Sequence, residues 1–396
     1  MTMDPKMNLP VNLARWATGA NRTLEPDSTW KDSGWNDSTK PPARWQNWLQ
    51  KLNYEWTQRI GGLLVGNWQV VNSAITASLP EALIHHPTME DGGLWMLINS
   101  AEAVIKSVDG RNWTAAGTNV LDTLASRQVA AIDSSNIIFG GIHSSSTGLA
   151  YTSNKGVSWS VDTGIPESVA PNFIVSKYPD SDLLIAAVSA GTNKVYIASG
   201  GVGSSWVAAT TDPGLSLEGG VRVGANSFMG IGGAGVTYIS SDDGDTWAGT
   251  PGSPSDVGLN SIARAMGCDR ETGTIVAVGT ATAAAPTNVA TVAFTRNQGL
   301  TWTRATVYGA EQSTKLENVY ACGGGLWFAN GVLSGLGSGA GFVSFDDAET
   351  WYPASYFGDR ITPSAIQDVA SDGRMLLAAR SDNRVAHSLS IPGYMP

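Results

Sequence analysis

The sequence predicts an all-β fold in which seven similar four-stranded sheets close into a ring, preceded by a short helical segment. Three observations predict it. A motif that ends in tryptophan recurs six times, its copies are spaced by about the length of one four-stranded sheet, and strand-like segments at both ends of the repeat region can complete one further sheet. A glycine content of 46 in 396 residues fits the many tight turns of such a fold.

The repeated motif reads Ser/Thr-x-Asp/Asn-x-Gly-x-Ser/Thr-Trp. Five segments fit it, namely TSNKGVSW at 152–159, SGGVGSSW at 199–206, SSDDGDTW at 240–247, TRNQGLTW at 295–302 and SFDDAETW at 344–351. A sixth, SVDGRNW at 107–113, fits with one residue deleted. Gly201 replaces the acidic residue in the second of the five segments, and Ala348 replaces glycine in the last.

Each motif segment is expected to form a turn between the third and outermost strands of a sheet. The Asp or Asn side chain can accept hydrogen bonds from turn amides, Gly supplies the unusual φ angle, and Trp offers a large area to bury against the neighbouring sheet. We assign this structural role to Ser107, Asp109, Trp113, Asn154, Gly156, Trp159, Gly203, Trp206, Asp242, Gly244, Trp247, Asn297, Gly299, Trp302, Asp346 and Trp351.

The spacing of the motifs sets the size of the repeat. From Trp113 to Trp351 the Trp-to-Trp steps are 46, 47, 41, 55 and 49 residues. Steps of this length match one four-stranded blade of a β-propeller. Apolar strand-like segments separated by glycine turns precede each motif, as in NSFMGIGG followed by GVTYISS.

The two ends of the repeat region predict how the ring closes. Residues 364–371, 373–381 and 383–390 are predicted to form three strands of a last blade that has no motif. Residues 66–73 are predicted to form a single strand with Trp68 near its start, 45 residues before Trp113. Pairing the early strand with the last blade would remove exposed sheet edges. Seven Trp positions would then mark seven outer strands, with six or eight blades as alternatives.

The motif resembles the Asp-box, also called the BNR repeat, of sialidases and many other β-propellers. The resemblance implies an Asp-box β-propeller over residues 63–396 and a structural role for the motif aspartates.

Residues 1–62 lack the repeat and hold six of the 15 tryptophans. A helix is expected at about 41–60, because two prolines suit its first turn, two glycines follow it, and its apolar residues recur at helical spacing. These apolar residues are Trp45, Trp48, Leu49, Leu52, Trp56 and Ile60. The stripe could pack on the chain's own propeller or on another subunit.

This segment resembles the N-terminal part of many tailed-phage tail and fibre proteins. The matching residues are Arg15, Trp16, Gly34, Trp35, Pro41, Pro42, Asn47, Trp48 and Leu49. The resemblance implies a module for virion attachment or assembly. The residues that we expect to anchor the chain are Arg15, Trp16, Trp35, Trp45, Trp48, Leu49, Leu52 and Trp56.

Enzymatic motifs of related propellers are missing. A sialidase needs an Arg-Ile-Pro motif, but Arg59–Ile60 precedes glycine and Arg360–Ile361 precedes threonine. A glycoside hydrolase would need a pair of carboxylates, for which loop positions offer Glu90, Asp91, Glu167, Glu218, Glu271, Glu311 and Asp359 without any pairing in the sequence. His85 and His86 are too few for a metal site. We therefore expect no catalytic, cofactor-binding or metal-binding residue.

Charge and composition exclude other classes. Residues 1–60 carry eight basic and six acidic groups, a net charge of +2. Because the whole chain has a net charge of -10, the remaining residues carry a net charge of -12. An acidic body without clustered Lys and Arg argues against nucleic-acid binding. No apolar stretch reaches the 20 or so residues of a membrane span. Cys268 and Cys322, the only cysteines, give no disulfide framework and fit a reducing compartment.

These observations together predict a non-enzymatic structural or adsorption component of a phage tail, made in the host cytoplasm and residing in the virion. Its partners would be other tail proteins, through residues 1–60, and a homo-oligomer is expected in the particle. A cell-surface glycan would be the ligand of a receptor-binding propeller. The alternatives are a glycoside hydrolase or sialidase-like enzyme on the same fold, and an assembly factor.

Overall fold

A computed structural model describes residues 69–70, 80–91, 93–99, 101, 103–118, 121, 123–124, 130–259, 261–281, 289–308, 313–333, 339–353, 366–371, 376–380 and 385–387. The chain divides into two compact units, Met1–Gly61 and Gly62–Pro396, and the described residues all belong to the second. The expected helix at 41–60, the anchoring residues and Trp68 lie outside the described residues.

The described strands form seven sheets, which we number by the chain order of their inner strands. Sheet 1 holds β2 (Pro80–His86), β3 (Leu94–Asn99), β4 (Ala103–Ser107) and β5 (Thr114–Thr118). Sheet 2 holds β6 (Thr123–Leu124), β7 (Ala130–Ile132), β8 (Ile137–His143), β9 (Ser146–Thr152) and β10 (Ser160–Asp162). Sheet 3 holds β11 (Pro171–Ser176), β12 (Leu184–Val188), β13 (Val195–Ala198) and β14 (Val207–Ala208). Sheet 4 holds β15 (Leu217–Arg222), β16 (Phe228–Gly232), β17 (Thr237–Ser240) and β18 (Ala248–Gly249).

The remaining three sheets complete the set. Sheet 5 holds β19 (Ser261–Cys268), β20 (Ile275–Ala281), β21 (Val289–Thr295) and β22 (Thr303–Arg304), and the 3-10 helix η1 (Pro254–Val257) precedes it. Sheet 6 holds β23 (Thr306–Val307), β24 (Ser313–Gly323), β25 (Leu326–Leu333), β26 (Gly339–Ser344) and β27 (Thr350–Pro353). Sheet 7 holds β1 (Gln69–Val70), β28 (Ile366–Ser371), β29 (Leu376–Arg380) and β30 (Val385–His387).

The prediction of an all-β fold with four-stranded antiparallel sheets is confirmed, with two enlarged sheets as a difference. In sheet 2, β6 and β7 both pair with β8, so that two short strands share the place of one inner strand. In sheet 6, β23 adds to the outermost strand β27 in parallel. This extra strand comes directly after β22 of sheet 5, and it therefore joins two neighbouring sheets at their outer edges.

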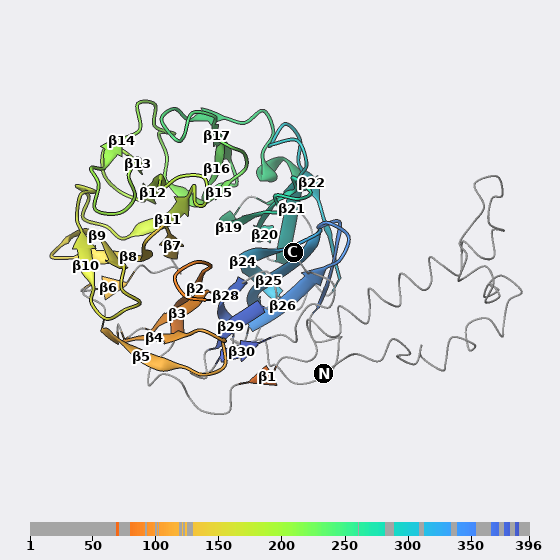
Figure 1. The fold of residues 1–396 in the computed structure, drawn as a ribbon. Helices are drawn as coiled ribbons and strands as arrows, with labels where there is room; N and C mark the ends of the chain where they lie inside the picture. Colours follow the sequence, from red (N-terminus) through yellow and green to blue (C-terminus); the bar gives the residue numbers. More distant parts are fainter. Residues whose placement is uncertain are drawn as a thin grey trace, which may run out of the picture. The chain divides into compact units, whose positions relative to one another are not determined.

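The sheets surround a central axis, and their inner strands contact one another in the cyclic order β2, β7, β11, β15, β19, β24, β28 and again β2 (Figure 1). The early strand β1 pairs antiparallel with β30, with Gln69 opposite His387 and Val70 opposite Ala386. A strand near the start of the second unit therefore completes the sheet that contains the last described strands.

The second strand of a sheet is buried on both faces because a neighbouring sheet covers each side. In β3, β12 and β16 every residue is buried, which explains why these segments are apolar runs without alternation. The outermost strands β18 and β22 are exposed and only two residues long. Among the described residues, the core thus lies between the sheets, in six clusters of buried side chains that each draw on two consecutive sheets.

Candidate functional site

The motif segments form turns between the third and outermost strands, for example between β17 and β18. There, Asp242 Oδ1 accepts the amide of Thr246 at 2.9 Å and the hydroxyl of Ser240 at 2.8 Å. Its Oδ2 accepts the Thr246 hydroxyl at 2.5 Å. The Ser240 hydroxyl in turn accepts the amide of Gly244 at 2.9 Å. Both oxygens of the Asp242 carboxylate therefore accept hydrogen bonds from residues of the same turn.

The other motif turns repeat this pattern with small changes. Oδ1 of Asp346 accepts the Thr350 amide at 2.9 Å, and Asn154 and Asn297 accept the corresponding amides at 2.9 and 3.0 Å. Ala348, at the glycine position, has a positive φ of 71°, and its amide donates to the Ser344 hydroxyl at 3.0 Å. Alanine thus occupies a backbone conformation that favours glycine.

The shortened first motif holds its acid most firmly. Oδ1 of Asp109 accepts the Arg111 and Asn112 amides at 2.9 and 2.8 Å, and the Ser107 hydroxyl at 2.9 Å. Burial acts to raise the pKa of Asp109, but hydrogen bonds from Asn112, Arg111 and Ser107 outweigh it and hold this pKa at about 2. A carboxylate of this kind stays ionised and cannot serve as a general acid near neutral pH.

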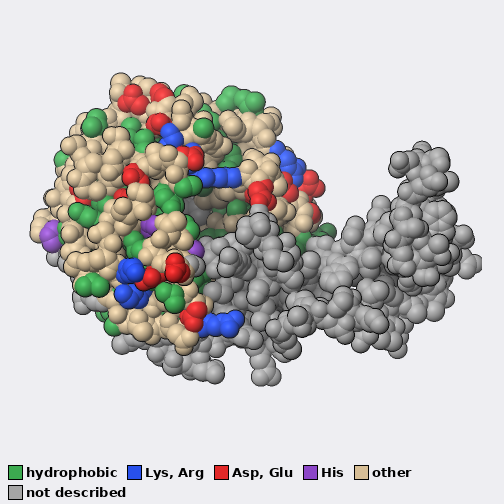
Figure 2. All heavy atoms as spheres, in the orientation of Figure 1, with side chains coloured by type: hydrophobic (Ala, Val, Ile, Leu, Met, Phe, Trp, Pro, Cys, Tyr) green, Lys and Arg blue, Asp and Glu red, His purple; other side chains and the backbone are tan. Residues whose placement is uncertain are grey.

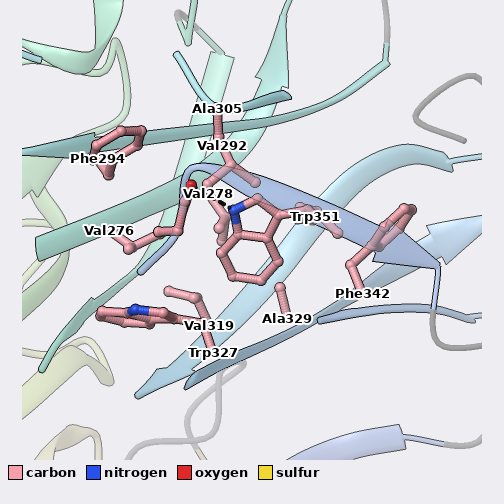
Figure 3. Close-up of a cluster of buried hydrophobic side chains, with 12 residues drawn as sticks. Val276, Val278, Val292, Phe294, Ala305, Val319, Trp327, Ala329, Phe342 and Trp351 are labelled. Carbon is pink, nitrogen blue, oxygen red and sulfur yellow. Dashed lines mark hydrogen bonds between the residues drawn. The ribbon is translucent and has the colours of Figure 1, made fainter. Parts of the chain in front are cut away.

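Each motif tryptophan packs against the preceding sheet. Trp351 from sheet 6 lies among Val276, Val278 and Val292 of sheet 5 as well as Trp327 of its own sheet (Figure 3). Its indole N–H donates to the carbonyl of Ala348 at 3.0 Å. The same relation between neighbouring sheets holds for Trp113, Trp159, Trp206, Trp247 and Trp302.

The motif without an acid uses a carboxylate from the preceding sheet. Oδ2 of Asp162, at the end of β10, accepts the amide of Gly203 at 2.7 Å and the indole N–H of Trp206 at 2.9 Å. Gly201 has a φ of 80°, and a Cβ at this position would lie 2.8 Å from Asp133 Oδ2. The sequence motif pointed to neither Asp162 nor Asp133.

Among the described loop carboxylates considered for glycoside hydrolysis, Glu90, Glu167 and Glu271 each have a separate partner. Glu90 pairs with Lys155 at 2.7 Å. Glu167 accepts the Tyr196 hydroxyl at 2.6 Å, and Glu271 accepts the Gly324 amide at 3.0 Å. These three acids have three different partners. Asp91 is exposed, Glu218 is half-buried, and Glu311 and Asp359 lie outside the described residues.

Among the described carboxyl groups, Asp368 on β28 has a strongly raised pKa, and it is 7% exposed. Burial raises its pKa to about 7, although it accepts hydrogen bonds from the Leu83 amide, the Tyr320 hydroxyl and the Val369 amide. Such a pKa would suit a general acid. All three partners, however, belong to inner strands of the ring. The Asp368 carboxyl group therefore holds these inner strands together.

Burial shifts the pKa of His86 and of both cysteines. The ring nitrogen Nε2 of His86 lies 2.8 Å from the carbonyl oxygen of Asp133, and burial lowers the pKa of His86. Both cysteines are free thiols, and burial raises the pKa of Cys268 to about 11 and of Cys322 to about 12. Within the described ranges, no three His, Cys, Asp or Glu side chains gather as metal ligands, and no helix could cross a membrane.

A pocket of about 330 Å³ lies between the inner strands of sheets 1 to 5, and we call it the axial pocket. It is lined by Ile84, Ala130, Ala131, Ile132, Ile174, Val175, Ser176, Gly220, Val221, Arg222, Cys268 and Arg270. Ser176, Arg222 and Cys268 are the last residues of their strands, so the pocket opens at the end of the axis where these strands finish. On the face seen in Figure 2, Lys and Arg side chains lie beside the central hollow.

Arg222 is the fixed charge of this pocket and is 6% exposed. Its guanidinium donates to the carbonyl oxygens of Lys177 at 2.7 Å, Gly224 at 2.9 Å and Ala225 at 3.0 Å. It also pairs with the carboxylate of Asp180. Arg222 therefore ties sheet 4 to the turn between β11 and β12.

No family model matches the chain, and no curated protein matches it. Solved structures do resemble its fold. A structure of YCF48 bound to D1 peptide matches with a TM-score of 0.57 and 12% identity, covering 83% of this chain and 98% of that one. The GH74 xyloglucanase from Xanthomonas campestris matches with a TM-score of 0.59 and 14% identity, covering 83% of this chain and 54% of that one.

A structure of RRP9 WD40 repeats matches with a TM-score of 0.53 and 11% identity, covering 82% of this chain and 97% of that one. This chain thus spans about half of the xyloglucanase and nearly all of the other two proteins. Identities of this size show a shared fold only. The described part of the chain is a β-propeller.

Proposed function

We propose that the protein is a non-enzymatic structural or adsorption component of a phage tail, present in the virion and made in the host cytoplasm. Its propeller is a rigid display or receptor-binding module, and residues 1–60 attach it to other tail proteins. The proposal includes seven blades, one for each of the seven sheets, and a homo-oligomer in the particle.

The observation that carries the structural role is the use of the motif acids. In Asp109, Asp242 and Asp346, both carboxylate oxygens accept hydrogen bonds from groups of the same turn. Side chains committed in this way rigidify the motif turns, and these three acids are held in structural hydrogen bonds. The tail location is supported by the resemblance of residues 12–56 to the N-terminal part of phage tail and fibre proteins.

Deletion of residues 1–60 tests the attachment role. Phage that carry the truncated gene should assemble particles that lack the protein, as measured by mass spectrometry of purified virions against full-length controls. Incorporation of the truncated propeller at the normal stoichiometry would refute attachment through this segment.

A carbohydrate-active enzyme is the second candidate, and the fold similarity to the xyloglucanase is the observation in its favour. Incubation of the full chain with xyloglucan and with host polysaccharide, followed by an assay for new reducing ends, decides between the two functions. Release of oligosaccharides would favour the enzyme.

An assembly factor is the third candidate, because a propeller of the same size, YCF48, has been solved with a bound peptide. Such a factor would act during construction and leave. The same mass-spectrometric inventory then discriminates, since an assembly factor is absent from the finished particle.

A further inference from the structure

The motif residue that directly follows the Asp or Asn position varies in sequence but keeps one backbone conformation, and we call it position 4 of the motif. In sheets 2, 4, 5 and 6 this position holds Lys155, Asp243, Gln298 and Asp347, with φ angles of 62°, 60°, 53° and 57°. Residues other than glycine keep a positive φ only where the surrounding structure holds them in it. Contacts between a motif turn and its surroundings are therefore expected at position 4.

In sheets 2 and 4, position 4 forms an ion pair with the preceding sheet. Lys155 Nζ of sheet 2 lies 2.7 Å from Glu90 Oε1, in the turn between β2 and β3 of sheet 1. The Lys155 carbonyl also accepts Nζ of Lys106, on β4 of sheet 1, at 2.7 Å. Asp243 Oδ1 of sheet 4 accepts Nζ of Lys177 at 2.6 Å, and Lys177 lies in the turn between β11 and β12 of sheet 3.

Position 4 makes the equivalent contact in sheets 3 and 6 without an ion pair. The Asp347 carboxylate of sheet 6 accepts the hydroxyls of Thr272 at 3.0 Å and Thr274 at 2.6 Å, from the turn between β19 and β20 of sheet 5. In sheet 3, the amide of Val202 donates to Asp133 Oδ2 at 3.3 Å, in the turn between β7 and β8 of sheet 2. In each of these four sheets, position 4 therefore contacts the turn between the first two strands of the preceding sheet.

The charge at position 4 is opposite in sign to that of the turn that it contacts. Glu90 of sheet 1 meets a lysine, whereas Lys177 of sheet 3 meets an aspartate. Gln298 of sheet 5 is uncharged, and the sequence of the preceding turn, residues 223–227, holds no charged residue. The side chains of Lys177 and Asp243 are 12% and 35% exposed, so solvent screens their pair less than the pair of sheets 1 and 2, at 32% and 43%.

We propose that position 4 of the motif is a recognition position at which each sheet binds the turn of the preceding sheet, and that the charges there specify which sheets can be neighbours in the ring. Sheet 2 fits an acidic turn and sheet 4 a basic one. Sheet 6 fits a turn that carries hydroxyls, and sheet 5 an uncharged turn. A like charge at position 4 would replace an attraction by a repulsion at the same short distance. This inference is independent of the proposed place in a phage tail.

An exchange of motif turns within the full chain tests the proposal. Residues 154–158 of sheet 2 and 242–246 of sheet 4 are equally long, and both hold position 4 at nearly the same φ. One chimera exchanges the two turns completely, which places an aspartate opposite Glu90 and a lysine opposite Lys177. The matched chimera exchanges the same turns but keeps Lys155 and Asp243 in their own sheets. Hydrogen exchange of the turn amides should be about fivefold faster in the complete exchange than in the matched one.

Point variants separate the effect of charge from the effect of the turn. Lys155→Asp and Asp243→Lys should each speed exchange in their own turn, and Glu90→Lys added to Lys155→Asp should restore the wild-type rate. Gln298→Lys and Gln298→Asp are the controls, because they introduce the same charges at the same φ beside an uncharged turn. Each should alter the exchange rate by less than about twofold.

Three outcomes overturn the proposal. The first is equal exchange in the two chimeras, and the second is an equal effect of the new charges at Gln298 and at the ion-paired positions. The third is a failure of Glu90→Lys to restore the rate in Lys155→Asp. Melting curves check that each protein is folded, and the point variants decide alone if the chimeras do not fold.

Discussion

The hydroxyl of Tyr320 donates a 2.8 Å hydrogen bond to Oδ1 of Asp368, whose other oxygen accepts the Leu83 amide at 2.7 Å. Tyr320 lies on β24, Asp368 on β28 and Leu83 on β2, so one buried carboxyl joins the inner strands of sheets 6, 7 and 1. Sheet 7 contains both the early strand β1 and the last strands of the chain. The contact therefore lies where the ring is completed.

Replacing Asp368 by Asn should remove a pH dependence of stability. Burial raises the folded pKa to about 7 from an ordinary 3.8, so the native state binds this proton more tightly than the unfolded chain. Native stability should fall as pH rises from about 4 to about 7, by at most about 1.4 kcal/mol per pH unit from this group. Urea unfolding across this range measures the slope.

Tyr320→Phe is the matched control for Asp368→Asn. It removes a donor to the carboxylate, so stability should drop by about 1–3 kcal/mol while the falling slope persists. Parallel pH profiles for the wild-type chain and Asp368→Asn would contradict the assignment of the slope to Asp368.

Replacing Asp109 by Asn should change the pH dependence of stability at acidic pH. The contribution of Asp109 is opposite in sign to that of Asp368, because it falls as pH falls. Burial opposes the ionised form, but hydrogen bonds hold the folded pKa at about 2, below the ordinary 3.8. The stabilisation is present above the unfolded pKa and is lost as pH falls through about 2. Asp109→Asn should therefore show a shallower loss of stability below about pH 4 than the wild-type chain. Asp91→Asn, at an exposed loop position, is the control for the removal of one acidic charge.

Replacing Asp162 by Ala should destabilise the motif turn of sheet 3. The amide of Gly203 and the indole N–H of Trp206 would both lose their acceptor, at a cost of about 1–3 kcal/mol in unfolding free energy. Chemical unfolding monitored by tryptophan fluorescence measures it. An unchanged midpoint would show that Asp162 does not replace the missing motif acid.

Restoring the motif acid by Gly201→Asp should also destabilise the fold, although the repeat pattern favours Asp at this position. A side chain there would adopt a φ of 80° and approach Asp133 Oδ2 to 2.8 Å, and we expect a loss of at least about 1 kcal/mol. A raised melting temperature would contradict this expectation.

A disulfide between β1 and β30 should lock the ring. Val70 and Ala386 are backbone register partners, so Val70→Cys combined with Ala386→Cys puts two cysteines at directly opposed positions of β1 and β30. The bridge would close a loop of roughly 300 residues and stabilise the oxidised chain by about 5 kcal/mol relative to the reduced one. Melting curves with and without reductant measure the gain, and peptide mapping identifies the bridge.

Val70→Cys with His387→Cys is the control for this bridge. These two positions are offset by one residue in the backbone register. Oxidation should not link them. Equal bridging in both variants would show that β1 does not hold the register described here.

The local part of the fold was predictable from the sequence. A motif turn makes its hydrogen bonds within about eight residues, so a regular Trp spacing was enough to predict the turns and the size of a sheet. The strand pattern at 364–390 likewise anticipated β28, β29 and β30, and β1 falls inside the strand expected at 66–73.

Contacts between sheets were not predictable in this way. Asp162 and Gly203 are 41 residues apart, and Tyr320 and Asp368 are 48 residues apart, so each pair depends on how two sheets are placed side by side. The axial pocket draws on five inner strands. Arg270 has the sequence context of any exposed loop arginine, and only the closed ring brings it to the opening.

The pairing of β1 with β30 has a consequence for how this chain could be rewired. Because Gln69 and His387 face each other across adjacent strands, a short linker could join the natural ends of the propeller. New termini could then be opened in an exposed turn between two other sheets. The order in which the sheets leave the ribosome would change, while every sheet would keep both of its neighbours.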